Sequence, residues 1–230
     1  MRRVSAVTVR SRARGPRRSP AGAAGFALLL VLAAAPVPAG SIRGRLSLAR
    51  PSGEPRANVR DAVVWIEQVP EKTERRLSHV PFRWFWQRRK PPAIARIVER
   101  GRRYQPYVTV ITTGSALLLC NRDLVWHGPF SVSPVYPFDF GKRPPGRVDT
   151  LRFERSGVVM LRCDIHPDMA AYVIVTPNHA YSRPDSNADW RLPELPAGRY
   201  VVHAWHPNHD ELHRTVTVPS HGAVELSLHW

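Results

Sequence analysis

The feature that most constrains this chain is the run Cys163–Met169 (sequence CDIHPDM), which carries a thiol, an imidazole and a thioether within one short stretch. Neither the 3.6-residue repeat of a helix nor the two-residue repeat of a strand brings these three donors to one point. Apolar residues of high β-propensity lie on both sides, at 158–162 and at 170–176. The sequence therefore predicts two strands joined by a tight loop that can bind a metal ion.

The donor types in this loop favour copper. Sulfur ligands combined with imidazole suit copper, and a weak methionine donor beside two histidines and a cysteine is typical of electron-transfer copper sites. His127, upstream in the chain, is the candidate for the second imidazole. If Cys163 binds metal, we expect the other cysteine, Cys120, to be a buried free thiol.

Two other interpretations of Cys163 stay open. In an oxidising compartment the two cysteines of this chain, Cys120 and Cys163, could form a disulfide. Cys163 and His166 could instead belong to a zinc site. Zinc normally takes a further cysteine, histidine or carboxylate rather than Met169 as its next ligand.

Residues 1–39 are predicted to be an export signal. Seven arginines precede an apolar run at 21–35, and small residues at 37–39 lead to a cleavage point before Gly40. The apolar run is shorter than the roughly 20 residues that a membrane-spanning helix needs. An uncleaved anchor is the alternative. We expect a mature chain that is periplasmic or otherwise exported.

Basic charge is concentrated in one segment of the mature chain. Removing seven arginines and no acid lowers the formal charge from +16 to +9, and residues 71–103 hold eleven Lys or Arg against three Glu. This segment also contains the aromatic run FRWFWQRRK at 82–90. It is predicted to be a basic, aromatic insertion that could contact an anionic membrane surface. Alternatively, its aromatics cover a sheet edge while its arginines face water.

The rest of the mature chain indicates an all-β fold. Short apolar segments separated by turn residues, with almost no helical stretch, are typical of a β-sandwich. The predicted strands lie at 41–49, 62–67, 107–112, 116–120, 148–153, 158–162 and 170–176.

Two stretches, NRDLVWHGPFSVSP and FERSGVVMLRCDIHPDMAAYVIV, resemble the cupredoxins, and the loop spacing is similar to that of plastocyanin- and amicyanin-like members. The resemblance covers 104–176. It implies a Greek-key β-sandwich that holds one type 1 (blue) copper ion through four ligands, His127, Cys163, His166 and Met169. In one departure, Gly128 stands where the family commonly has asparagine. Its backbone N–H is expected to donate to the Cys163 thiolate.

A second resemblance concerns the two ends of the mature chain. The stretch LPELPAGRYVV at 192–202 looks like carboxypeptidase regulatory-like domains, as do the strands at 43–48 and 62–66. The methylamine-utilisation-type exported proteins combine such a domain with a cupredoxin. We therefore expect a second small β-sandwich built from 41–70 plus 177–230, with the cupredoxin domain inserted in it or packed on it.

The resemblance implies a carrier of single electrons that works with a redox partner protein. We expect no enzyme, because four donors leave no open metal position and no nucleophile-elbow, HExxH or glycine-rich phosphate motif is found. Nucleic acid is not an expected partner of an exported protein. The alternatives are copper capture or delivery through the same ligands, and a structural or carbohydrate-binding sandwich without metal.

Two further expectations concern histidines. His166 is predicted to be the electron's exit, and Asp164 and Asp168 beside it give negative charge, whereas the 71–103 segment is basic. The other histidine cluster is expected to consist of surface residues on a strand and hairpin, because a metal site needs convergent donors. Its members are His203, His206, His209 and His213.

Overall fold

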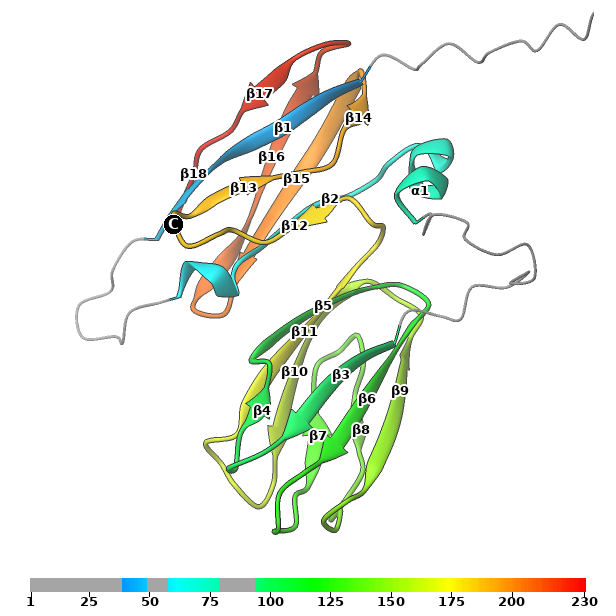
Figure 1. Ribbon diagram of the computed structural model, residues 1–230, viewed down its shortest axis with the longest axis vertical. Coiled ribbons are helices and arrows are strands. Elements are labelled where there is room, and N and C mark those ends of the chain that lie inside the picture. The colour runs from blue at the N-terminus through cyan, green and yellow to red at the C-terminus, as the bar shows by residue number, and fades with distance from the viewer. Residues whose placement is uncertain (1–38, 49–57, 79–93) are drawn as a thin grey trace, which may run out of the picture. The chain divides into compact units, whose positions relative to one another are not determined.

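The computed structural model describes residues 39–48, 58–78 and 94–230, and it confirms the predicted fold class (Figure 1). The described chain is built almost entirely of β-strands. Its helices are the 3₁₀ turn η1 (Val59–Asp61) and the helix α1 (Glu71–Leu77). No helix among the described residues is long and apolar enough to cross a membrane. The predicted export signal lies outside the described residues except for Ala39, which begins the first strand.

The central part of the chain forms two sheets, which we call the site sandwich. One sheet has the strand order β4-β3-β6-β9 and the other β5-β11-β10-β7-β8. The first consists of β4 (Tyr104–Gln105), β3 (Ile94–Glu99), β6 (Ser115–Asn121) and β9 (Val148–Phe153). The second consists of β5 (Val108–Thr112), β11 (Ala170–Thr176), β10 (Gly157–Cys163), β7 (Pro129–Ser131) and β8 (Phe138–Asp139).

The two-residue strand repeat explains how the site sandwich closes. Alternate residues of β10 and β11 point inward, and the antiparallel register places Val159 opposite Val173 and Leu161 opposite Ala171. These side chains are buried in one cluster with Ile97, Leu117 and Leu119 of the other sheet. Cys163 continues the inward face of β10, so the same alternation that builds the core aims its sulfur inward.

A second sandwich, the terminal sandwich, is made from both ends of the described chain. Its sheets are β13-β1-β14, with β17 and β18 also pairing with β1, and β12-β2-β15-β16. The strands of the first are β13 (Asp189–Arg191), β1 (Ala39–Ser47), β14 (Leu195–Pro196), β17 (Ala223–Glu225) and β18 (Leu228–His229). Those of the second are β12 (Tyr181–Ser182), β2 (Val63–Ile66), β15 (Gly198–His206) and β16 (His209–Val218).

Strand pairing divides the described chain simply. Strands that precede residue 67 pair with strands that follow residue 180, whereas the described strands between 94 and 176 pair with one another. One buried cluster joins β1 to β2 and β15 through Ile42, Val64 and Val202. The assignment of these parts to a cupredoxin and a carboxypeptidase regulatory-like domain stays a prediction.

The segment 71–103 contains two regular elements. Residues 79–93, with the aromatic run, lie outside the described residues. On either side the structure has α1 and β3, and β3 pairs in parallel with β6 inside the site sandwich. The sequence pattern did not predict β3, because the carboxylate of Glu99 occupies an inward position where an apolar residue would complete the alternation.

Candidate metal centre

Three of the four predicted ligands come from two segments that are distant in the chain. Cys163, the last residue of β10, pairs with Pro129 of β7, and His127 precedes that proline by two residues. His166 lies in the loop that joins β10 to β11. The β7–β10 pairing therefore places His127 beside the loop that carries Cys163 and His166.

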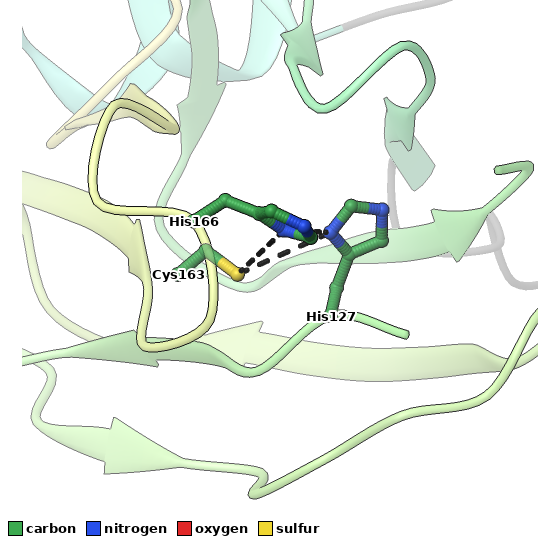
Figure 2. A group of neighbouring side chains, drawn as sticks. All are labelled: His127, Cys163 and His166. Atoms are coloured by element: carbon green, nitrogen blue, oxygen red, sulfur yellow. Dashed lines mark hydrogen bonds between the residues drawn. The ribbon is translucent and has the colours of Figure 1, made fainter. Parts of the chain in front are cut away.

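The donor atoms of these three residues face one another (Figure 2). The Cys163 Sγ lies 4.0 Å from Nδ1 of His127 and 3.7 Å from Nδ1 of His166, and the two nitrogens are 3.1 Å apart. Two donors bound at usual lengths to one tetrahedral or trigonal ion are separated by about 3.5 Å. The observed separations surround that value, so the donor set fits a single metal ion.

Burial around the donors is unequal. His127 is fully buried and Cys163 is 3% exposed, whereas His166 is partly exposed. Asp164 and Asp168, on either side of His166, are exposed. The site therefore reaches solvent mainly through His166, at a rim that carries two carboxylates.

Met169 ends the loop and lies inside the protein. It is 1% exposed, belongs to the same buried cluster as Cys163, and its backbone N–H donates to the carbonyl of His166 at 2.9 Å. That bond closes the loop into a turn. The thioether as a fourth ligand stays a prediction.

Gly128 takes part in the site through its backbone. Its N–H donates to the Cys163 Sγ at 3.3 Å, as the sequence predicts. A Cβ at this position would lie 1.6 Å from Oδ1 of Asp164, whose carboxylate occupies the space beside the glycine. The asparagine common in the resembling family would therefore require Asp164 to move.

Cys120 is free and buried, as expected for a chain in which Cys163 is not in a disulfide. It lies on β6, in the other sheet of the site sandwich. The structure thus gives no support to a Cys120–Cys163 disulfide.

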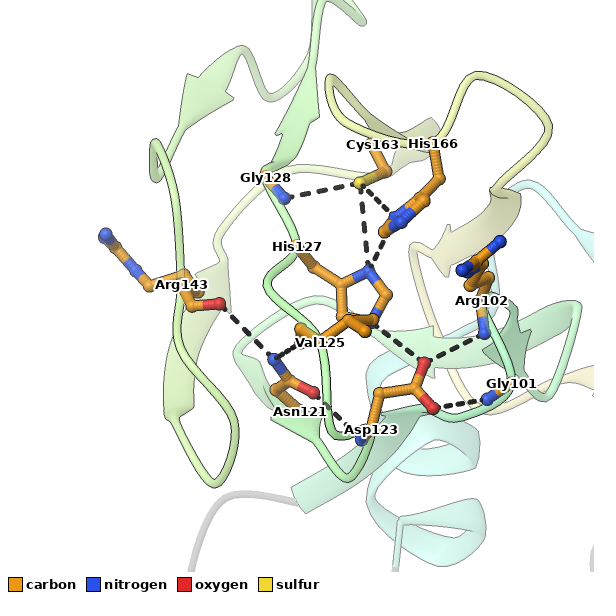
Figure 3. A network of polar contacts seen from close by, with 10 residues as sticks. All are labelled: Gly101, Arg102, Asn121, Asp123, Val125, His127, Gly128, Arg143, Cys163 and His166. Carbon is orange, nitrogen blue, oxygen red and sulfur yellow. Dashed lines mark hydrogen bonds and ion pairs between the residues drawn. The ribbon is translucent and has the colours of Figure 1, made fainter.

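Asp123, which the sequence did not predict, orients the ring of His127 through Nε2, the ring nitrogen on the side away from Cys163 and His166 (Figure 3). Its Oδ2 accepts a hydrogen bond from His127 Nε2 at 2.9 Å. The backbone N–H groups of Gly101 and Arg102 donate to its two oxygens at 2.6 and 2.9 Å. Because an ionised carboxylate only accepts, the ring proton lies on Nε2 and the Nδ1 lone pair points to the site.

The electrostatics of this pair agree with that arrangement. Burial lowers the pKa of His127, against the opposing effect of Asp123, so the ring is neutral near pH 7. Desolvation opposes ionisation of Asp123, but its hydrogen bonds from the amides of Arg102 and Gly101 and with His127 hold its pKa below the usual value. A neutral imidazole is the form that binds metals.

Asn121 supports the loop that carries Asp123. Its Oδ1 accepts from the Asp123 N–H at 3.0 Å, and its Nδ2 donates to the carbonyls of Val125 and Arg143. The only sequence signal for Asp123 is a carboxylate four residues before a histidine. That spacing has structural meaning in a helix, but it has none in an irregular loop.

Replacing Asp123 by alanine is expected to weaken metal binding at this site by about 10- to 100-fold, because His127 loses the partner that fixes its tautomer and ring orientation. The measurement is a competition titration against a chelator of known affinity. Asp168→Ala removes the same charge from an exposed position near the site and is the matched control. Equal losses in both variants would show that net charge, and not the hydrogen bond to His127, accounts for the effect.

The other histidine cluster lies on the β15–β16 hairpin. His203 is opposite His213, and its Nδ1 lies 2.6 Å from Glu211 Oε1. The rings of His206 and His209, at the turn of the hairpin, are 5.1 Å apart. The expectation of surface residues is wrong for His206, which is 2% exposed and has its Nε2 3.3 Å from the Asn58 carbonyl oxygen. Within the described ranges, the group of His, Cys, Asp or Glu donors close enough to share a metal ion is that of His127, Cys163 and His166.

Comparisons with known proteins place the site in context. No family model and no curated protein matches this chain. Among solved structures, it is similar to a mutant of amicyanin with Cu(I) (18% identity, 36% of this chain, 81% of that chain, TM-score 0.34). A purple cupredoxin from Nitrosopumilus maritimus also matches (23% identity, 36% of this chain, 99% of that chain, TM-score 0.34).

A third similar structure is the copper-containing nitrite reductase of Thermus scotoductus SA-01 (22% identity, 37% of this chain, 23% of that chain, TM-score 0.35). All three similarities cover little more than a third of this chain and are too distant to assign it to a family. What the fold and the site define is an all-β protein in which one cysteine and two histidines bring their donor atoms close enough to hold a metal ion.

Proposed function

We propose that this chain is an exported type 1 copper protein that carries single electrons between redox partners. The observation that supports it is the convergence of His127 Nδ1, Cys163 Sγ and His166 Nδ1 in a largely buried position between two loops. One thiolate and two imidazoles are the in-plane donors of electron-transfer copper sites. Export is proposed from the sequence of residues 1–39.

In this proposal His127, Cys163 and His166 would hold one copper ion, and Met169 would supply a fourth, weaker sulfur donor. Copper bound there supplies a one-electron couple between Cu(I) and Cu(II), and a His2Cys set with a weak axial sulfur suits both states. Zinc is less well matched, because structural zinc sites normally take four nitrogen, sulfur or carboxylate ligands without methionine.

The surrounding residues keep the donors in place. Gly128 donates its N–H to the thiolate, and Asp123 holds the ring of His127. Hydrogen bonds to a ligand sulfur and to the far nitrogen of a ligand histidine tune a metal site and limit its rearrangement. A site that moves little between oxidation states transfers electrons with a small reorganisation cost.

His166 is the proposed exit for the electron. It is the donor that reaches solvent, so a partner protein can approach it more closely than His127 or Cys163. We propose no substrate turnover, since all four donors are occupied by the ion and no binding position is left for a reacting molecule. The role is that of an electron carrier and not of an enzyme.

Addition of Cu(II) to the purified mature protein tests this function. We expect an intense absorption band in the red part of the visible spectrum, from thiolate-to-copper charge transfer, and a reversible one-electron potential. A Met169→Leu variant is expected to keep the colour and to change the potential. A protein that stays colourless contradicts the proposal, and tight Cu(I) binding without a reversible potential would indicate copper delivery instead.

A further inference from the structure

Five exposed arginines gather on one side of the site sandwich. They come from β3, from the turn between β3 and β4, and from the loop after β6, and they are Arg96, Arg100, Arg102, Arg103 and Arg122. None of them forms an ion pair within the described residues. Of the 18 acidic residues of the chain, only Glu54 lies outside the described ranges. The positive charge of this cluster is therefore almost wholly uncompensated by the described chain.

Three of these arginines line a groove. Strand alternation puts Arg96 on the outer face of β3, and Arg100 follows directly after this strand. Arg122 completes the lining together with Val98, Gln105 and Pro106. No acidic residue takes part in the lining. Guanidinium groups present planar, forked donors that match carboxylates in pairs of hydrogen bonds. A concave surface with three such groups fits a ligand that carries several carboxylates.

Two acids, Glu99 and Asp123, are adjacent in sequence to arginines of this surface, but neither forms an ion pair with them. Asp123 receives its hydrogen bonds from the amides of Gly101 and Arg102 and from His127. Glu99 points inward and is 1% exposed, and its burial favours the uncharged form. Neither carboxylate forms an ion pair with a guanidinium group of this surface, so most of the positive charge is available to a partner.

Apolar side chains border the arginines. Leu124 is 95% exposed and Trp126 is 52% exposed, and both lie in the loop that begins with Arg122. The hydrogen bonds of Asp123 hold this loop against the β3–β4 turn, where Figure 3 shows Arg102 close to Asp123 and His127. Exposed tryptophan and arginine together are enriched in the parts of protein interfaces that contribute most binding energy.

We propose that this arginine surface, the five arginines with Leu124 and Trp126, is the docking site for an acidic partner protein. Because the surface is positive, charge complementarity requires a partner whose contact surface is negative. The exposed leucine and tryptophan supply the apolar contact that a purely ionic surface lacks. That the partner exchanges electrons with this chain rests on the proposed function. A single side chain connects the surface to the site, because the Asp123 carboxylate accepts hydrogen bonds both from the amides of the β3–β4 turn and from His127 Nε2.

The test is an NMR titration of the ¹⁵N-labelled mature chain with a short polyglutamate peptide at low salt, first without metal and then with Cu(I). We expect shift changes confined to 96–105 and 122–126, and binding that weakens as salt is added. Arg100→Gln with Arg122→Gln is expected to raise Kd about tenfold. Arg152→Gln with Arg199→Gln, two exposed arginines away from the groove, removes the same charge and is expected to leave Kd unchanged.

Other probes decide between partners. Inorganic phosphate and phosphatidylglycerol vesicles are titrated in the same way. The proposal is overturned if the peptide binds equally to both double variants, or if the vesicles and not the peptide depend on Arg100 and Arg122. Because the first titration is done without metal, its failure leaves the copper proposal standing, and failure to bind copper leaves the docking result standing.

Discussion

Replacing Cys163 by serine is expected to abolish the intense visible band that the proposed copper centre would give. The band requires a sulfur donor, and the Cys163 Sγ is the atom that lies 3.7 and 4.0 Å from the two imidazole nitrogens. Serine is similar in size and leaves the buried position filled, but its hydroxyl is a harder and weaker donor for copper. Absorption spectra of both proteins at equal copper loading measure the loss.

The matched control is Cys120→Ser. Both cysteines are free and 3% exposed, so each substitution replaces one buried thiol by a hydroxyl. Cys120 is not among the converging donors, and its variant is expected to keep the full band. If Cys120→Ser loses the colour and Cys163→Ser keeps it, the metal centre has been assigned to the wrong thiol.

The loop from Cys163 to Met169 was predictable because its information is local. The strands on both sides alternate clearly, and three donors within one short loop can meet without help from distant residues. The position of His127 beside Cys163 was not predictable from spacing, since it depends on the pairing of β7 with β10. The donor chemistry made His127 a candidate, and the resemblance to a known family implied the same residue, but neither gave the strand pairing that places it there.

Residues that act through irregular backbone were missed. The carboxylate of Asp123 is held by two amides of the β3–β4 turn, more than twenty positions earlier in the chain. No periodicity links a loop carboxylate to a turn that distant. The predicted partner surface, residues 71–103, is only partly described, and the arginine surface extends beyond it to Arg122.

The strand β3, which ends at Glu99, was not predicted for a different reason. A strand is recognised by apolar residues at every second position, and this carboxylate occupies an inward position of β3. Strand pairing with β6 overrides the local preference, because Ile97 and the β6 leucines bury apolar area that compensates for a polar neighbour. The free energy that the buried Glu99 carboxyl costs the folded protein depends on pH, and this dependence can be measured.

Burial raises the pKa of Glu99 from 4.5 to about 7, and the nearby charges of Asp149 and Asp123 add to the rise. Below pH 4.5 the carboxyl is protonated in both the folded and the unfolded chain, and it costs nothing. Between pH 4.5 and 7 the unfolded chain releases the proton while the folded chain keeps it, so stability falls as pH rises. Above pH 7 the loss levels off at about 3 kcal/mol.

Glu99→Gln is therefore expected to stabilise the metal-free protein by about 3 kcal/mol more at pH 8 than at pH 4.5, because the amide keeps the shape and cannot ionise. Urea unfolding at both pH values gives the two free energies of unfolding. Any cost of burying the amide is the same at both values and cancels in the comparison. Glu154→Gln, which changes an exposed acid directly after β9, removes the same charge and is the matched control. If Glu99→Gln changes the free energy of unfolding equally at both pH values, the pKa of Glu99 is not raised in the folded protein. Its buried carboxylate would then be ionised and stabilised by its surroundings.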